Sequence, residues 1–402
     1  MKKRVFVSVL ASLLVLSLIF TAGCGSSSSG SGSGSGASST PFIIGITQPL
    51  TGANAEAGTH ALNAMKLCVK QINEAGGLNG QMLEIVSYDD ESDPATCLSL
   101  MTKMATDSSI KAIGGSIISG CVLASLDTIA QYKIPTYCGG LSASLTASGN
   151  EYFWRSLINQ DFIAVDIVKS IQDMGFKTIA IFGTQDEASM AAALNLRKSV
   201  EAMNIDVVAW EEGDAKDISY SAQCASIVAS NPECVYMSAV TPMQPVFIKE
   251  LRQSGYTGLV FSRESYAQNA IDIAGTDASY GIVFSWPNLT YVDLEECKDP
   301  FLYSFLEAYQ KEYGALPVND CAYRGYNSLL IMAEAARIAG VNEREAINEA
   351  TGKISGLQIL GGLCDFTDGQ HEPLRGGTMY MVIEGGKYQL LDEWIAAGGL
   401  NK

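Results

Sequence analysis

The sequence predicts an α/β protein with two lobes, each built on a parallel, doubly wound sheet flanked by helices. First, short apolar runs alternate with amphipathic helical stretches from Phe42 onward, a pattern typical of parallel strands joined by helical crossovers. Second, the alternation begins again at Phe162. Third, it gives about ten strands, and open sheets of that size usually split. Two sheets of about five strands each are therefore expected.

In the first half of the chain, each expected element has a local signal. Residues 60–75 place four apolar side chains on one helical face, and GGLNG then ends that helix. Asp93 and Pro94 suit the cap and first residue of another helix, and helical spacing returns from Cys121. The expected strands are 42–46, 82–88, 112–113 and 134–137.

The second half repeats the alternation and then changes character. After Pro287 the pattern is mainly helical, and the chain ends in two alternating runs around Gly385 and Gly386, which predict a β-hairpin. In chain order, the expected strands are 177–183, 206–210, 234–239 and 258–262, and the expected helices are 162–174, 190–202, 221–229, 245–254, 301–313, 322–339 and 343–350.

The N-terminus has the pattern of a secretory leader. Basic residues at positions 2–4 precede an apolar run of about 16 residues, which is short for a membrane span. The run ends in TAGC, which resembles the lipid-attachment box of bacterial lipoproteins, although Thr21 stands where such boxes usually have leucine. We expect a signal peptide over 1–23, and a lipidated Cys24 with a flexible Gly/Ser linker over 24–40. A plain secretory signal and an uncleaved anchor are the alternatives.

The composition excludes several kinds of partner and cofactor. The 402 residues are 47% hydrophobic, enough for a sizeable core. A formal charge of −17 repels nucleic acid, so no nucleic-acid partner is expected. The chain has two histidines, His60 and His371, and no C-x-x-C, so neither a metal nor a cofactor is expected.

The cysteines of an exported protein can pair, and nine remain beside Cys24. Two candidate disulfides follow from the expected elements. Cys97 and Cys121 both fall in the first turns of helices that follow strands. Cys224 lies on the helix before the strand that Cys234 begins.

Three polar loops follow expected strands, at the edge where parallel sheets bind ligands. Ser116–Gly120 and Cys138–Ser144, in the first lobe, offer hydroxyl and N–H donors, whereas Ser262–Tyr266, in the second, offers the carboxylate of Glu264. This opposition suits a zwitterion, with donors for its carboxylate and Glu264 for its ammonium. Taken singly, each serine would suit a cap or turn, and Glu264 a solvated surface.

An enzyme is a competing class that the sequence does not favour. It has no G-x-S-x-G elbow, and neither a P-loop lysine nor a G-x-G-x-x-G accompanies the loop that ends at Gly120. Two histidines give little choice of general base. The acidic run YDDESDP lacks the glycine and terminal glutamate of a calcium loop, so it is expected to be a capping loop.

Five motifs carry a family resemblance: IGITQPLTG, GTHALNAMKLCVKQINEAGGLNGQMLEIVSYDDESDP, GGSIISG, IPTYCGGLSASLT and GGLCDFTDGQ. They resemble the extracytoplasmic binding proteins of the branched-chain amino-acid type, which serve ABC transporters, over nearly all of Phe42–Trp394. The resemblance implies two Rossmann-like lobes joined by three crossings, with the ligand in the cleft. The expected lobes are 41–159 plus 288–364 and 160–287 plus 365–402.

The resemblance also implies roles for individual residues. It places Ser119 on the ligand carboxylate, with Ser142 as a further donor. It implies that Glu264 and the backbone oxygen of Gly140 bind the ligand ammonium. The rest of the expected ligand shell is Ser116, Gly120, Leu141, Ala188 and Tyr323.

Two positions depart from the family pattern. Ala57 and Ala188 stand where the family has an aromatic residue and a tyrosine. Their small size predicts a roomier pocket, refilled by Trp154, Tyr266 or Tyr323.

The resulting expectation is a binding protein and not an enzyme. It captures an amino acid of the branched-chain type, or a related small zwitterion, and serves the permease subunits of an ABC importer. It is expected to be a monomer, held at the outer face of a bacterial cytoplasmic membrane by lipid on Cys24. The alternative is a sensing protein on the same fold that binds another small carboxylate and signals to a membrane partner.

Overall fold

The computed structural model describes residues 40–52, 54–214, 216–239, 242–291, 293–374 and 376–401. The predicted signal peptide, Cys24 and the linker up to residue 39 lie outside the described residues. The side chain of Ala188 also lies outside them, although its backbone belongs to a helix. Within the described ranges, no helix combines the length and the apolar character needed to cross a bilayer.

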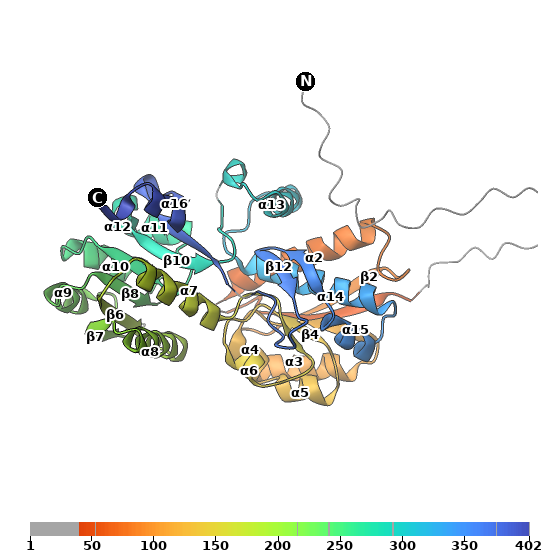
Figure 1. Ribbon diagram of the computed structural model, residues 1–402. Helices are drawn as coiled ribbons and strands as arrows, with labels where there is room; N and C mark the ends of the chain where they lie inside the picture. The colour runs from red at the N-terminus through yellow and green to blue at the C-terminus, as the bar shows by residue number, and fades with distance from the viewer. Residues whose placement is uncertain are drawn as a thin grey trace, which may run out of the picture. The chain divides into compact units, whose positions relative to one another are not determined.

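The first sheet has five parallel strands (Figure 1). They are β1 Phe42–Gln48, β2 Leu83–Asp89, β3 Ile110–Gly114, β4 Thr136–Cys138 and β5 Phe153–Arg155, in the order β2-β1-β3-β4-β5. β1 lies inside the sheet and is buried along nearly its whole length. A strand covered on both faces has no polar side, which explains its continuous apolar run FIIGI.

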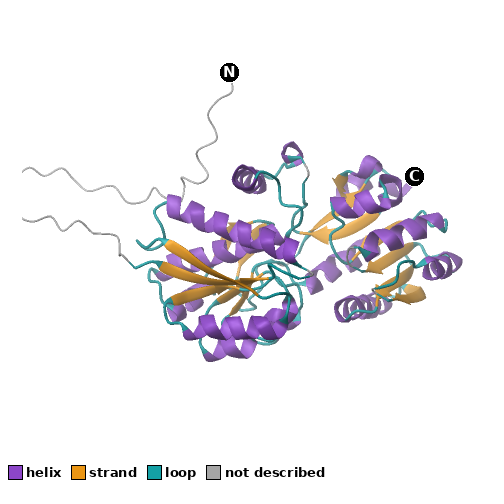
Figure 2. Ribbon diagram, turned by 180° about the vertical axis from the view of Figure 1, so that it is seen from behind, coloured by secondary structure: helices purple, strands orange, loops and turns teal. Residues whose placement is uncertain are grey.

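Helices from two distant parts of the chain cover this sheet (Figure 2). We call the sheet and these helices the first lobe. α14 packs along α2, and Gly325 permits the close approach, because a Cβ there would lie 2.4 Å from the Ala61 carbonyl oxygen. The helices are α2 Ala55–Glu74, α3 Pro94–Thr106, α4 Ser119–Leu123, α5 Leu126–Gln131, α6 Ser144–Ala147, α13 Pro300–Tyr313, α14 Cys321–Ala339 and α15 Arg344–Thr351.

The second sheet has seven strands, in the order β14-β13-β10-β9-β8-β6-β7. The strands are β6 Thr178–Thr184, β7 Asp206–Gly213, β8 Cys234–Ser238, β9 Leu259–Ser262, β10 Ile282–Trp286, β13 Thr378–Val382 and β14 Tyr388–Leu390. β6 to β10 are parallel, whereas β13 runs antiparallel to both β10 and β14.

Helices again flank this second sheet, and together they form the second lobe (Figure 2). They are α7 Gln160–Asp173, α8 Glu187–Ala202, α9 Ser221–Ala229, α10 Met243–Gln253, α11 Gln268–Ala274, α12 Thr276–Ser279 and α16 Leu391–Ala396. Short 3-10 turns occupy Leu294–Glu296, Glu384–Gly386 and Gly399–Asn401.

The chain passes between the two sheets three times. It does so from β5 to α7, from β10 to α13, and from a two-stranded ladder of β11 Ser355–Ile359 and β12 Gly362–Asp365 to β13. The predicted fold class, two doubly wound lobes with three crossings, is therefore confirmed. The exact residue boundaries of the lobes stay a prediction.

Two expectations about single elements were wrong. The helix expected from Cys121 is divided into α4 and α5, because the Ser125 hydroxyl donates to the Cys121 carbonyl at 3.1 Å and competes with the backbone. The second sheet has seven strands and not about five, because β10 and the terminal hairpin join it. That hairpin is confirmed by the pairing of Tyr380 with Leu390 and of Val382 with Tyr388.

The acidic run YDDESDP is a capping loop, as predicted. The Asp89 carboxylate accepts from the Leu50 N–H at 2.8 Å, which fixes the turn after β1. The Asp93 carboxylate accepts from the Thr96 N–H at 2.7 Å and caps α3.

Gly325→Ala should lower the free energy of unfolding by about 1–3 kcal/mol, because the added methyl group would overlap the Ala61 carbonyl oxygen of α2. Urea denaturation followed by circular dichroism measures it. The control is Gly352→Ala, where φ is −65° and the nearest neighbour of a Cβ is 3.5 Å away, so stability should hold or rise. An unchanged urea midpoint for Gly325→Ala would contradict the tight contact of α2 with α14.

Candidate functional site

The loop between β3 and α4 is held by Gln48, at the end of β1. This side chain is buried, and its Nε2 donates to the Gly115 carbonyl at 2.8 Å. Its Oε1 accepts from the Ile117 N–H at 3.3 Å. One amide therefore fixes the loop at the carboxyl end of the sheet, where ligands of such folds bind.

Ser119 begins α4 and connects this loop to the next one. Its Oγ accepts a hydrogen bond from the Ser142 N–H at 3.2 Å, which leaves the hydroxyl proton for another acceptor. The N–H groups of Ser119 and Gly120 stand at the first helical positions and have no intrahelical partner. Gly120 is exposed, and the nearest atom to a Cβ there would be Pro94 Cγ at 4.0 Å. Open space therefore lies beside these donors.

Two buried arginines hold the loop that follows β4 by its carbonyl groups. Arg155 donates through Nη1 to the Gly140 carbonyl and through Nη2 to the Ser142 carbonyl, the latter at 2.8 Å. Arg324, on α14, lies 3.4 Å from the Gly139 carbonyl. The predicted use of the Gly140 oxygen for a ligand ammonium therefore competes with a guanidinium already bound there.

Arg155 is itself paired with Glu372. The Nε–Oε2 distance is 2.9 Å, and the two side chains are 0% and 5% exposed. Glu372 also accepts from the Asn159 amide at 3.0 Å and from the Thr146 hydroxyl. Burial lowers the pKa of Arg155, and the charge of Glu372 opposes that shift. The pair ties the loop after β4 to the third passage between the sheets.

Glu264 follows β9 in the second lobe and is paired with its neighbour Arg263. The Nη2–Oε1 distance is 2.9 Å, and the Glu264 side chain is 25% exposed whereas that of Arg263 is 7% exposed. Burial lowers the pKa of Arg324, but Asp320 and, more weakly, Glu264 raise it above its usual value. The field of Glu264 therefore reaches the start of α14, the helix whose arginine lies against the loop after β4.

Ser116 has a structural position instead of the predicted ligand contact. It is fully buried, its Oγ accepts from the Ile118 N–H at 3.3 Å, and its carbonyl accepts from the Cys138 thiol at 2.9 Å. Burial raises the pKa of Asp90, and the hydroxyls of Ser116 and Thr47 oppose that shift. Ser116 thus supports the loop from inside.

Tyr323 and Leu141 are also held by the protein itself. Tyr323 is 2% exposed, packs edge to face against Phe305, and donates to the Leu289 carbonyl at 3.0 Å. This core position argues against the predicted ligand contact of Tyr323. Leu141 is partly buried against the main core, and its carbonyl accepts from the Gln160 N–H at 3.4 Å.

The aromatic residues expected to refill the pocket have other partners. Trp154 stacks on His371, with ring centroids 3.6 Å apart. Tyr266 is fully buried, with its hydroxyl 3.3 Å from that of Ser279. The small side chain of Ala57 packs beside the loop that carries Ser119, and that of Ala188 lies outside the described residues.

The nine cysteines in the described part of the chain are all free thiols. Neither candidate disulfide is formed: Cys224 and Cys234 each donate to a backbone carbonyl. Cys97 and Cys121 are nevertheless neighbours, since their sulfur atoms and a carboxylate oxygen of Asp90 all lie within 4.8 Å of one another. That spacing would suit a metal ion. The closeness of Cys97 and Cys121 was expected from the sequence, whereas the presence of Asp90 beside them was not.

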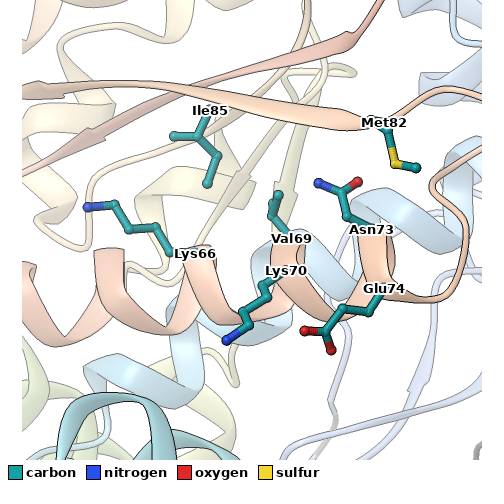
Figure 3. A pocket seen from close by; sticks show the side chains of 7 residues that line it. All are labelled: Lys66, Val69, Lys70, Asn73, Glu74, Met82 and Ile85. Atoms are coloured by element: carbon teal, nitrogen blue, oxygen red, sulfur yellow. The ribbon is translucent and has the colours of Figure 1, made fainter.

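A hollow on the first lobe lies between α2 and β2 (Figure 3). Lys70 on its rim is paired with Glu312 at 2.5 Å. The hollow opens near the beginning of β2, at the opposite end of the sheet from the loops described above. It therefore does not belong to the candidate ligand site. Its lining residues are Lys66, Val69, Lys70, Asn73, Glu74, Met82 and Ile85.

The residues that organise the site were not predicted from the sequence. Gln48 and Arg155 each end a buried strand, and a polar residue in that position is a signal that could have been noticed, because such residues are rarely buried without a partner. Arg263 likewise follows a buried strand directly. Glu372 has no comparable local signal.

The family described as periplasmic binding protein matches residues 41–387 of the chain. The leucine-, isoleucine-, valine-, threonine-, and alanine-binding protein of Pseudomonas aeruginosa is 24% identical over 312 residues, which are 76% of this chain and 81% of that protein. Leu/Ile/Val-binding protein homolog 1 of Brucella abortus is 23% identical over 356 residues, which are 87% of this chain and 93% of that protein.

Two solved structures have the same fold. The branched-chain amino acid transporter substrate-binding protein LivJ of Streptococcus pneumoniae, in complex with isoleucine, has a TM-score of 0.73 at 21% identity and covers 87% of this chain and 98% of its own. A solute-binding protein of an ABC transporter from R. palustris, in complex with benzoate, has a TM-score of 0.71 at 20% identity and covers 87% and 95%.

Arg155→Met should lower the free energy of unfolding by about 3–5 kcal/mol, because it leaves Glu372 in a buried site without its counter-charge. The matched control is Arg197→Met, which removes an exposed ion pair with Glu201 on α8 and should cost about 1 kcal/mol or less. Urea denaturation of both variants measures the difference. Equal losses would show that the buried pair does not stabilise the site.

Proposed function

Because the chain belongs to the periplasmic binding protein family, we propose that it captures an amino acid between its lobes and delivers it to the permease subunits of an ABC importer. The ligand is of the branched-chain type or a related small zwitterion. The relatives from P. aeruginosa and B. abortus are named for binding such amino acids. The observation that carries the proposal is the hydrogen bond between Ser119 and Ser142, because it joins two donor loops at one place.

These two loops form the carboxylate half of the proposed site. The Ser119 hydroxyl and the N–H groups of Ser119 and Gly120 are donors that the helix leaves unused. The Ser142 hydroxyl is a further donor within reach of the same place. Arg155 does not contribute, because its Nη groups face backbone carbonyls. The ligand carboxylate is therefore bound by neutral donors.

Glu264 forms the ammonium half. Its Oε1 is engaged by Arg263, but a carboxylate has about four acceptor positions, so Oε2 is left for the ligand. The Gly140 carbonyl has a second lone pair, yet the bound guanidinium of Arg155 repels a cation. The ammonium therefore depends mainly on Glu264.

A second candidate function follows from the same arginines. Because Arg155 occupies the Gly140 carbonyl and Arg263 occupies part of Glu264, both ammonium acceptors are already engaged. The R. palustris protein was solved with benzoate, a carboxylate without an ammonium group. The alternative is therefore a sensing protein that binds such a carboxylate and signals to a membrane partner.

The anchoring of the protein is also proposed, on the TAGC motif. The protein acts as a monomer outside the cytoplasmic membrane, tethered by lipid on Cys24. Cys24→Ser should abolish lipid attachment, so that fractionation and immunoblotting find released protein or unprocessed precursor. Thr21→Leu restores the usual box and should leave anchoring intact. Normal processing and membrane association of Cys24→Ser would refute the anchor.

Calorimetry tests the two halves of the site. Ser119→Ala should weaken the tightest amino acid of a thermal-shift screen by about 1.5–3 kcal/mol, since one charge-assisted hydrogen bond is lost. Glu264→Gln should weaken it by about 2–5 kcal/mol, since the ammonium loses its counter-charge. The same ligand without its amine should bind the wild type weakly and lose little more in Glu264→Gln.

The controls are Ser199→Ala and Glu201→Gln, exposed residues of α8 that should leave affinity unchanged. If the deaminated ligand binds wild-type protein as tightly as the amino acid does, the ammonium site is absent and the second candidate function stands.

A further inference from the structure

Arg263 lies at the carboxyl end of β9 and has more donors than partners. Its Nη2 contacts Glu264 Oε1 at 2.9 Å and the Ser189 hydroxyl at 3.5 Å. Its Nε is buried and has no hydrogen-bond partner among the described residues. A guanidinium carries five N–H donors in a rigid fork, and at least the Nε donor of this one is unused by the described residues.

An unused donor on a buried guanidinium is unfavourable, because its desolvation is not offset by an acceptor. The arginine lies next to Glu264, the residue assigned to the ligand ammonium, at the edge of the sheet where ligands of this fold bind. A ligand that reaches Glu264 is thus within reach of the Arg263 guanidinium. The side chain of that ligand can supply the missing acceptor.

The carboxylates around Arg263 do not already fill this role. Glu264 engages Nη2. Asp186 is a second acidic group in the field of Arg263, but its carboxylate caps α8, accepting from the Ser189 N–H at 2.9 Å and from the Thr184 hydroxyl at 2.7 Å. Its charge is therefore balanced by the cap.

We propose that Arg263 binds a carboxylate on the side chain of the ligand, so that the amino acid captured is an acidic one. The inference rests on the proposed function, since it keeps the α-carboxylate on the Ser119 loop and the ammonium on Glu264. Three charged groups of the ligand then meet three complementary groups of the protein. An aliphatic side chain would instead leave the buried Nε of Arg263 without an acceptor.

The test is isothermal titration calorimetry on the purified full chain with L-glutamate, L-aspartate, L-glutamine, L-asparagine and L-leucine. Glutamate and glutamine have nearly the same shape, so their difference isolates the side-chain charge. We expect the better acidic ligand to bind about 10- to 100-fold more tightly than its amide. In Arg263→Met this ratio should fall to about one, and leucine should bind at least as well as before. Arg197→Met, which removes an exposed arginine of the same lobe, should leave the ratio unchanged.

The outcomes separate this inference from the proposed function. A wild-type preference for leucine over both acidic amino acids would overturn the inference alone, and binding of no amino acid would overturn both. An acidic preference that survives in folded Arg263→Met would also overturn it, because another residue would then read the charge. If Arg263→Met fails to fold, Arg263→Lys takes its place, because lysine keeps the positive charge but lacks the guanidinium fork. A lower ratio of acid to amide affinity in Arg263→Lys than in the wild type then supports the inference. A wild-type ratio of about one overturns it without any variant.

Discussion

The candidate site depends on one buried ion pair, between Arg155 and Glu372. Removing two charges from water is unfavourable, and proteins tolerate it only where geometry is good and further hydrogen bonds satisfy both groups. Here the guanidinium also holds the carbonyls of Gly140 and Ser142. Because the Ser142 N–H in turn donates to Ser119 Oγ, the pair also helps to orient the Ser119 hydroxyl, which is proposed to bind the ligand carboxylate.

The sequence was sufficient for features that are decided within a few residues. The cap at Asp93 and the hairpin around Gly385 follow from local hydrogen bonds and turn chemistry, and both were predicted correctly. The number of strands in the second sheet was not predicted correctly, because the pairing of Val283 with Met381 joins segments far apart in the chain. The local sequence of neither segment indicates this pairing.

The same division applies to the site. The sequence and its family resemblance brought Ser119 and Ser142 together, and the structure joins them directly, while their contact with a ligand stays a prediction. The burial of Ser116 was not visible, because a serine in a glycine-rich loop faces inward only if a buried partner such as Asp90 is there. The role of Arg155 was hidden for a related reason, since its partner belongs to the distant third passage between the sheets.

The contact of α2 with α14 at Gly325 has a consequence for the order of folding. Residues 178–286, which contain all the parallel strands of the second lobe, are made between these two helices. The part of α2 that packs on α14 therefore remains uncovered until α14 has been synthesised, and a long loop must then close. Domains usually fold in the order in which they leave the ribosome. In this chain the first lobe begins to leave the ribosome first, but its helix α14 is synthesised only after the parallel strands of the second lobe.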